Sequence, residues 1–169
     1  MLNLGNFTSR LIKRILPLME NIKKISQQII KSLPYLPNFL FVDDISEITE
    51  QKIVGHYTFT EEAFFFKSHF VHIPITPGVI LMEMMGQIGL VCLLVYLHKL
   101  HITQQKYHPI LQNIESSFLK QIYVNEKLTV VSEKVYFRNG ILKSNITLFN
   151  AENEICSLSN GQIRMIFDN

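Results

Sequence analysis

The longest apolar stretch of the chain covers residues 79–97, and Glu83 and Gln87 are its only strongly polar side chains. Its length is close to what a helix needs to span a membrane. A charged side chain in the hydrocarbon core, however, costs about 2.5–3.5 kcal/mol even on the most favourable insertion scales. Glu83 and Gln87 also lie four residues apart and therefore share one face of a helix. We expect no transmembrane span, but a central helix that a sheet buries on nearly all sides, with Gly86 and Gly89 allowing close approach.

The composition favours a globular protein with one hydrophobic core. Of the 169 residues, 47% are apolar and 18% are charged, so the chain has the length of one domain and ample apolar surface to bury. Residues 1–32 contain six basic residues and one acidic residue, a net charge of +5, whereas residues 33–169 contain 10 basic and 13 acidic residues. Because the larger part has no basic excess, we expect no binding to nucleic acid. We predict a basic helical extension at residues 1–32 and a main domain at residues 33–169.

The two cysteines, Cys92 and Cys156, are too few for a disulfide framework. Apolar residues near the N-terminus are interrupted by Arg10, Lys13 and Arg14, and no small-residue cleavage site follows them. Both observations lead us to expect a cytoplasmic location.

The spacing of apolar residues predicts helices at residues 8–32 and 77–100. Pro17 is expected to kink or divide the first of these helices. Six strand-like segments are rich in Val, Ile, Phe and Thr, at residues 39–49, 52–60, 110–120, 127–138, 141–150 and 154–167. Asn139-Gly140 predicts a tight type I′ hairpin between two of them. Antiparallel strands around one central helix make an α+β fold.

His69 and Glu83 are the candidate catalytic pair. His69 lies in a Phe-rich loop before the central helix, and Glu83 lies inside that helix, flanked by Met82, Met84 and Met85. An apolar environment favours the protonated carboxyl, and an acid beside an imidazole is suited to proton transfer near neutral pH. The Gly78 N–H, at the start of the helix, would provide an oxyanion site. The alternative is a hydrogen-bonded core histidine and a glutamate paired elsewhere.

The other histidines give no comparable signal. His98, His101 and His108 are close in sequence but come without a carboxylate, so we expect no metal and place them in solvent near the end of the helix. His56 and His72 are expected on a strand or on the surface, although His72 could line the site.

Residues 66–87 read FKSHFVHIPITPGVILMEMMGQ. This segment resembles the signature of the β-hydroxyacyl-(acyl-carrier-protein) dehydratases, which have the hotdog fold. In that family a Gly-His-Phe-Pro loop leads through Pro-x-Met-Pro-Gly-Val to a helix that carries Glu and, four residues later, Gln. Leu33-Pro34, residues 39–43 and residues 118–120 are also similar to the family, and the resemblance covers roughly residues 29–168.

The resemblance implies a hotdog fold, in which an antiparallel sheet wraps around a long central helix, here with the extra N-terminal helical segment. It also implies conversion of a (3R)-3-hydroxyacyl chain, carried on the phosphopantetheine arm of acyl carrier protein, to the trans-2-enoyl product without a further cofactor. His69 would be the general base and Glu83 the general acid. The remaining expected site residues are Gly78 at the oxyanion, Gln87 orienting Glu83, and Val79 and Phe70 at the substrate.

The resemblance further implies that His and Glu come from opposite protomers. We therefore expect a homodimer or a trimer of dimers with sites at the dimer interface, and a heterodimer is possible.

The chain departs from the family at several positions: Ser68 replaces Gly, Val71 replaces Pro, Thr76 replaces Met, and Tyr35-Leu36 replaces His-Arg. These departures favour a specialised member, acting in fatty-acid or polyene or polyketide-type biosynthesis. The alternatives are a hotdog acyl thioesterase and a non-catalytic, acyl-binding subunit of a heteromeric dehydratase. The N-terminal extension would pack on its own domain or on the dimer partner, or would dock acyl carrier protein or an anionic membrane surface.

Overall fold

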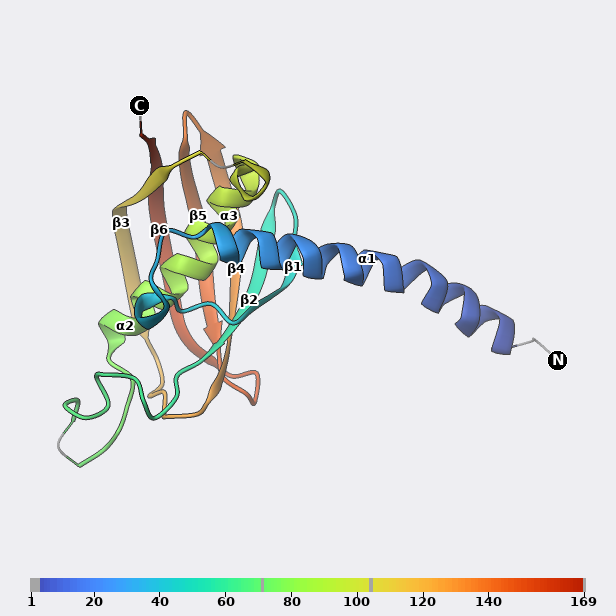
Figure 1. Cartoon of the computed structure of the whole chain (residues 1–169). Coiled ribbons are helices and arrows are strands. Elements are labelled where there is room, and N and C mark those ends of the chain that lie inside the picture. The colour runs from blue at the N-terminus through green and yellow to red at the C-terminus, as the bar shows by residue number, and fades with distance from the viewer. Residues whose placement is uncertain (1–3, 71, 104, 169) are drawn as a thin grey trace.

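The computed structural model describes residues 4–70, 72–103 and 105–168, with the backbone alone described at residues 4–14. Its body is one antiparallel sheet that wraps around a central helix, and a long N-terminal helix extends away from this body (Figure 1). The strand order is β1-β2-β4-β5-β6-β3. The strands are β1 (Asp44–Ile48), β2 (Lys52–Thr58), β3 (Tyr107–Phe118), β4 (Lys127–Arg138), β5 (Ile141–Phe149) and β6 (Ile155–Phe167). The predicted α+β architecture is confirmed.

The apolar stretch forms the central helix, which consists of α2 (Gly78–Gly86), a π-helical segment η2 (Gln87–Cys92) and α3 (Leu93–Leu97). In an 18-residue window of this helix, 72% of the residues are buried inside the protein. A short 3-10 turn, η3 (Leu100–Ile102), follows it. All residues from Met84 to Val95 are buried. The sheet covers the apolar side of the helix, whereas Gln87 is covered by the segment before β1 and Glu83 lies at a cavity.

Two glycines of the central helix have different surroundings. A Cβ atom on Gly89 would lie 3.1 Å from the side chains of Ile146 and Ser132, so strands β4 and β5 come close to the helix there, as predicted. A Cβ on Gly86 would meet no atom within 4 Å. The expectation of close strand approach at Gly86 is therefore wrong, because this residue faces a cavity.

The first predicted strand is shorter than expected. Only Asp44–Ile48 pairs with β2, whereas Pro37–Phe39 forms a 3-10 turn, η1, and the chain then runs irregularly to residue 43. The apolar residues of this segment resemble a strand in sequence, but their backbone groups are bound by the side chain of Gln87 instead of a neighbouring strand.

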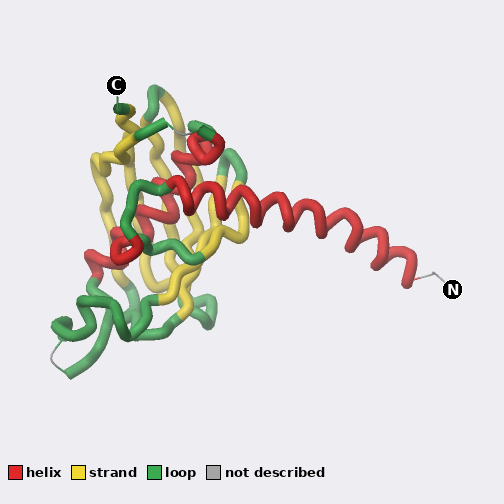
Figure 2. The backbone as a smooth tube through the Cα atoms, in the orientation of Figure 1, coloured by secondary structure: helices red, strands yellow, loops and turns green. Residues whose placement is uncertain are grey.

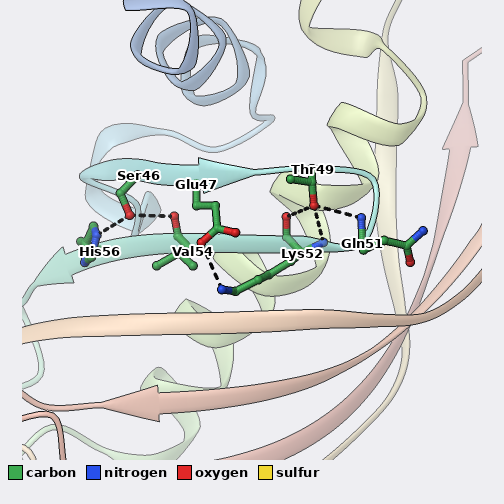
Figure 3. Close-up of polar contacts among 7 residues, drawn as sticks. All are labelled: Ser46, Glu47, Thr49, Gln51, Lys52, Val54 and His56. Atoms are coloured by element: carbon green, nitrogen blue, oxygen red, sulfur yellow. Dashed lines mark hydrogen bonds and ion pairs between the residues drawn. The ribbon is translucent and has the colours of Figure 1, made fainter. Parts of the chain in front are cut away.

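The hairpin of β1 and β2 is closed by side-chain contacts (Figure 3). The Thr49 hydroxyl accepts hydrogen bonds from the backbone N–H groups of Gln51 and Lys52, and Lys52 pairs with Glu47 at 3.0 Å. His56 contacts Ser46 across the hairpin at 2.8 Å, as expected for a histidine on a strand. The tight turn predicted between β4 and β5 is also confirmed, since Asn139 and Gly140 both have positive φ angles, of 52° and 72°.

The N-terminal helix α1 (Leu4–Ser32) is continuous through Pro17, so the expected division into two shorter helices is wrong. A proline removes one helical hydrogen bond, and the turns on both sides keep theirs. The end of α1 is fastened to the sheet: Ile45 N–H donates to the buried Ser26 hydroxyl at 3.1 Å, and the Tyr107 hydroxyl donates to Ser32 O at 2.7 Å. Burial raises the pKa of Tyr107 to about 12, so its hydroxyl remains a donor.

A long loop at residues 59–77 joins β2 to α2 and lies at one end of the sheet (Figure 2). It contains His69 and leads along the chain into the start of the central helix. Val71, where the family's Pro is replaced, lies outside the described residues.

Substitutions at Gly89 and Gly86 should have opposite effects on stability. We expect Gly89→Val to lower the free energy of unfolding by about 1–3 kcal/mol, because its side chain would overlap β4 and β5. Gly86→Ala should leave stability unchanged or raise it by up to about 1 kcal/mol, because the added methyl meets open space and alanine favours helix. Urea unfolding of both variants checks this, and equal destabilisation would contradict the described packing.

Candidate active site

The Gln87 side chain connects the central helix to the segment that precedes β1. Its amide is 1% exposed. The Oε1 atom accepts a hydrogen bond from Phe41 N–H at 2.8 Å, and Nε2 donates to Phe39 O at 2.9 Å. The second Nε2 hydrogen bond goes to Glu83 Oε1, also at 2.9 Å. Both N–H donors of the amide therefore form hydrogen bonds. The Gln87 side chain cannot rotate without breaking its bonds to Phe39 and Phe41, so it holds Glu83 in one orientation.

Gln87 is also the first residue of the π-helical segment, and its N–H contacts both Glu83 O and Met84 O. Short π segments inside α-helices occur frequently at functional sites. Here the π-helical segment, whose turns are wider than those of an α-helix, begins at Gln87, four residues after Glu83. The predicted shared face of Glu83 and Gln87 is present, and their side chains are in direct contact.

Glu83 faces a cavity of about 300 Å³ whose other walls are mostly apolar. The cavity lies between the central helix, the segment before η1, and strands β3 and β6. It is lined by Glu83 and Gln87 together with Tyr35, Val79, Met82, Gly86, Val91, Pro109, Leu111, Ile114 and Ile163.

The three methionines around Glu83 do not form one apolar shell. Met82 lines the cavity, but Met84 and Met85 are fully buried in the core. Glu83 itself is half-buried. Successive helical residues point about 100° apart, so sequence neighbours of Glu83 cannot all share its surroundings.

His69 is held in one tautomer by the loop. Its Nδ1 atom lies 3.3 Å from Ile75 O. A carbonyl oxygen can only accept, so Nδ1 carries the proton, and Nε2 of the neutral ring is free to accept one. The ring stacks on Phe70, with 3.9 Å between the ring centroids, and Phe70 is 59% exposed. In a neutral ring this contact leaves Nε2 as the nitrogen that can accept a proton.

Within one chain the structure does not bring His69 and Glu83 together. The cavity lining includes Glu83 but not His69, and among the described residues the hydrogen bonds of the two side chains lead to different partners, Gln87 and Ile75. A site that uses both side chains must therefore combine surfaces from two chains or a moved loop.

The start of α2 lies beside the same cavity. Pro77 O accepts the N–H groups of Ile80 and Leu81, while Val79 lines the cavity and is 69% exposed. A Cβ on Gly78 would lie 3.0 Å from the Phe118 ring, so glycine allows the helix to start close to β3. The N–H groups at the first turn of a helix favour negative charge, and Val79 of this turn lines the same cavity as Glu83.

Tyr35 is the site residue that sequence reasoning missed. It lines the Glu83 cavity, and burial, followed by the charge of Glu83, raises the pKa of its hydroxyl well above the usual range. The hydroxyl is therefore a neutral donor at the cavity wall. The one signal in the sequence was the replacement of the family's His-Arg by Tyr35-Leu36. The β3 residues of the cavity gave no signal, because a strand's partners are not visible in its own sequence.

The remaining histidines do not form a site. His98 packs edge-on against Phe137 and Phe167, and His101 stacks on Tyr96. Burial lowers the pKa values of His98 and His101, so both are neutral at pH 7 and the expected solvated position is wrong. Helix α3 ends at Leu97, so His98 reaches the aromatic side chains of β4 and β6, and the turn that carries His101 packs against α1. His108 instead pairs with Asp168 at 2.9 Å, and His72 is exposed.

Comparison with known proteins places this chain in a family. The sequence profile of the FabA-like domain matches residues 33–158. The 3-hydroxyacyl-(acyl-carrier-protein) dehydratase FabZ of Acinetobacter baumannii is 31% identical over 122 residues, which cover 72% of this chain and 82% of that protein. The FabZ of Clostridium perfringens is 40% identical over 76 residues, 45% of this chain, and the match spans about half the length of that relative.

Solved structures show the same fold at much lower identity. A hypothetical thioesterase from Streptococcus pneumoniae, solved with coenzyme A, has a TM-score of 0.56 at 13% identity. The match covers 74% of this chain and 86% of the thioesterase chain. Thioesterase HI1161 from Haemophilus influenzae has a TM-score of 0.53 at 15% identity. The match covers 73% of this chain and 78% of the HI1161 chain. These likenesses establish the hotdog fold, and the sequence match establishes the family. Because this match extends over residues 33–158, the chain belongs to the FabA-like domain family.

Proposed function

We propose that the protein dehydrates (3R)-3-hydroxyacyl chains, carried as thioesters on acyl carrier protein, to the trans-2-enoyl products. The observation that carries this proposal is Glu83, held by Gln87 at the wall of a cavity of about 300 Å³ whose other lining residues are mostly apolar. A fixed carboxyl beside apolar walls suits a substrate with a hydrocarbon chain and one hydroxyl that must leave as water. No further cofactor takes part in the proposed reaction.

The proposed reaction is an elimination in which each group has one task. His69 Nε2 removes a proton from C2, and the electron pair of that C–H bond forms the C2=C3 double bond. The C3–O bond breaks as Glu83 gives its proton to the hydroxyl, which leaves as water. First-turn N–H groups of α2, at Gly78 and Val79, stabilise the negative charge that develops on the thioester oxygen. The proton on His69 then returns to Glu83, directly or through water.

Assembly of two chains is part of the proposal. Strand β3 lies at one edge of the sheet and exposes Ile110, Leu111 and Phe118 there. Exposed strand edges pair readily with another strand. Pro109, Leu111 and Ile114 also line the Glu83 cavity, so a second copy at this edge would close the cavity. We propose that His69 of that second copy completes the site, in a homodimer or a larger assembly of dimers.

Mixing two inactive variants tests the shared site. We expect His69→Ala and Glu83→Gln each to lower turnover of a 3-hydroxyacyl carrier protein by about 10²–10⁴-fold, because each removes one proton-transfer group. Co-expression should restore activity: half of the dimers are mixed, and each has one intact site, which gives about a quarter of normal turnover. Enoyl product is measured on purified mixed protein, with each variant alone as the control.

Failure to restore activity would contradict a site built from two chains. Release of free acid and free carrier thiol, instead of enoyl product, would contradict dehydration and favour hydrolysis.

Gln87→Leu should impair turnover and stability together. It leaves Phe41 N–H and Phe39 O unpaired, which costs about 1–3 kcal/mol of folding free energy for each buried group that finds no other partner. Loss of the bond to Glu83 should lower kcat more than it raises KM, because the acid loses its orientation. Steady-state kinetics and urea unfolding measure both effects. A variant with normal kcat would contradict the role given to Gln87.

Gly86→Leu should shorten the accepted acyl chain. Its side chain would enter the cavity, since a Cβ at this position meets no atom within 4 Å. We expect turnover of long-chain substrates to fall at least about tenfold relative to short-chain ones, a loss equal to about 1.4 kcal/mol of binding. Gly86→Ala is the matched control. An equal effect on all chain lengths would contradict the placement of the acyl chain in this cavity.

A further inference from the structure

Helix α1 has an apolar face that changes from buried to exposed along its length. Ile15, Met19, Ile22, Ser26 and Ile29 follow one another at spacings of four and three residues, so they lie along one side of the helix. At the end near the sheet, Ser26 and Ile29 are 1% and 0% exposed. Further toward the N-terminus, Ile15 and Met19 are 42% and 60% exposed. The same face thus continues beyond the body of the protein without a covering element in the described chain.

Neighbouring side chains widen this exposed face. Leu16 and Leu18 are 52% and 59% exposed. A groove of about 500 Å³ opens where the helix leaves β1, with Leu16, Met19, Ile22 and Ile45 among its walls. In Figure 1 the helix continues away from the sheet past this point. Four large aliphatic side chains are therefore presented to the surroundings on a rigid, projecting element.

The charge on this element is opposite to that of the rest of the chain. Residues 1–32 have a net charge of +5, whereas residues 33–169 have 10 basic and 13 acidic residues. Lys23, Lys24 and Lys31 are exposed. Helices that combine an aliphatic face with a basic polar face and little overall hydrophobicity lie in the headgroup region of anionic membranes. A membrane surface rich in anionic lipids can contact both the apolar side chains and the basic side chains of this helix.

We propose that the free part of α1 binds flat on a membrane surface rich in anionic lipids. The apolar face of Ile15, Leu16, Leu18 and Met19 enters the boundary between headgroups and acyl chains. Lys23 and Lys24, directly after this part of the helix, contact the lipid phosphates. From Leu4 to Ile22 the helix measures about 27 Å, long enough for several turns to lie in the surface. The anchored end of α1, fastened by Ser26 and Tyr107, would hold the catalytic domain at that surface.

The test measures binding of the full chain to vesicles. The probes are vesicles of phosphatidylcholine alone and of phosphatidylcholine with phosphatidylglycerol, in a flotation assay. We expect at least tenfold tighter binding to the anionic vesicles and a loss of most of that difference in high salt, because the lysine contribution is screened. This comparison uses the unchanged protein, so it does not depend on whether a variant folds.

Substitutions then locate the bound surface. Leu16→Glu with Met19→Glu should weaken binding to anionic vesicles at least tenfold. Val135→Glu is the control, since Val135 is 51% exposed on β4 and lies outside α1. Unfolding midpoints near that of the unchanged protein would show that the variants are folded.

Several outcomes would overturn the proposal. These are equal binding to neutral and anionic vesicles, no binding at all, or an equal loss in the Val135→Glu control. If Leu16→Glu with Met19→Glu instead lowered the oligomeric state or the affinity for acyl carrier protein without changing vesicle binding, the face would be covered by another protein chain. Dehydratase activity is measured separately in solution, so its failure is distinguishable from failure of membrane binding.

Discussion

The Gln87 amide is the interaction on which the candidate site depends. It is buried in the middle of the central helix, and its three hydrogen bonds join Phe39, Phe41 and Glu83. Without them, the segment before β1 would have two unpaired backbone groups, and the carboxyl of Glu83 would be free to rotate. One side chain therefore fixes both the path of the chain over the helix and the direction of the proposed acid.

The sheet and the helix divide the apolar surface into a core and a cavity. Gly89 lets β4 and β5 come close to the helix, and a Cβ on Gly161 of β6 would lie only 2.7 Å from Leu90. No neighbouring side chain fills the space beside Gly86, so this space remains open as part of the cavity next to Glu83. The cavity reaches the edge strand β3, where Leu111 lines the cavity and is also exposed on the surface. The proposed shared site follows from this position.

Local pattern was sufficient to predict the central helix, strand β4 and the Asn139-Gly140 turn, because each depends on spacing or turn chemistry within a few residues. The segment 39–43 was wrongly predicted as strand, since its pattern does not reveal that Gln87, more than forty residues later, binds its backbone. The motif directed attention to His69 and Glu83, but Tyr35 and the β3 residues of the cavity depend on contacts between distant segments. Pro17 does not divide α1, because a long helix tolerates one missing hydrogen bond.

The most direct test of the proposed elimination follows the oxygen atom of the C3 hydroxyl during turnover. The full-length protein is incubated with a 3-hydroxyacyl carrier protein in water enriched in heavy oxygen, and the carrier is weighed by mass spectrometry. If Glu83 protonates the leaving hydroxyl in a reversible elimination, carrier that has lost one water accumulates, and the remaining hydroxyacyl carrier takes up heavy oxygen. Unloaded carrier thiol with heavy oxygen in a released fatty acid, or a substrate that stays unchanged, would contradict the account.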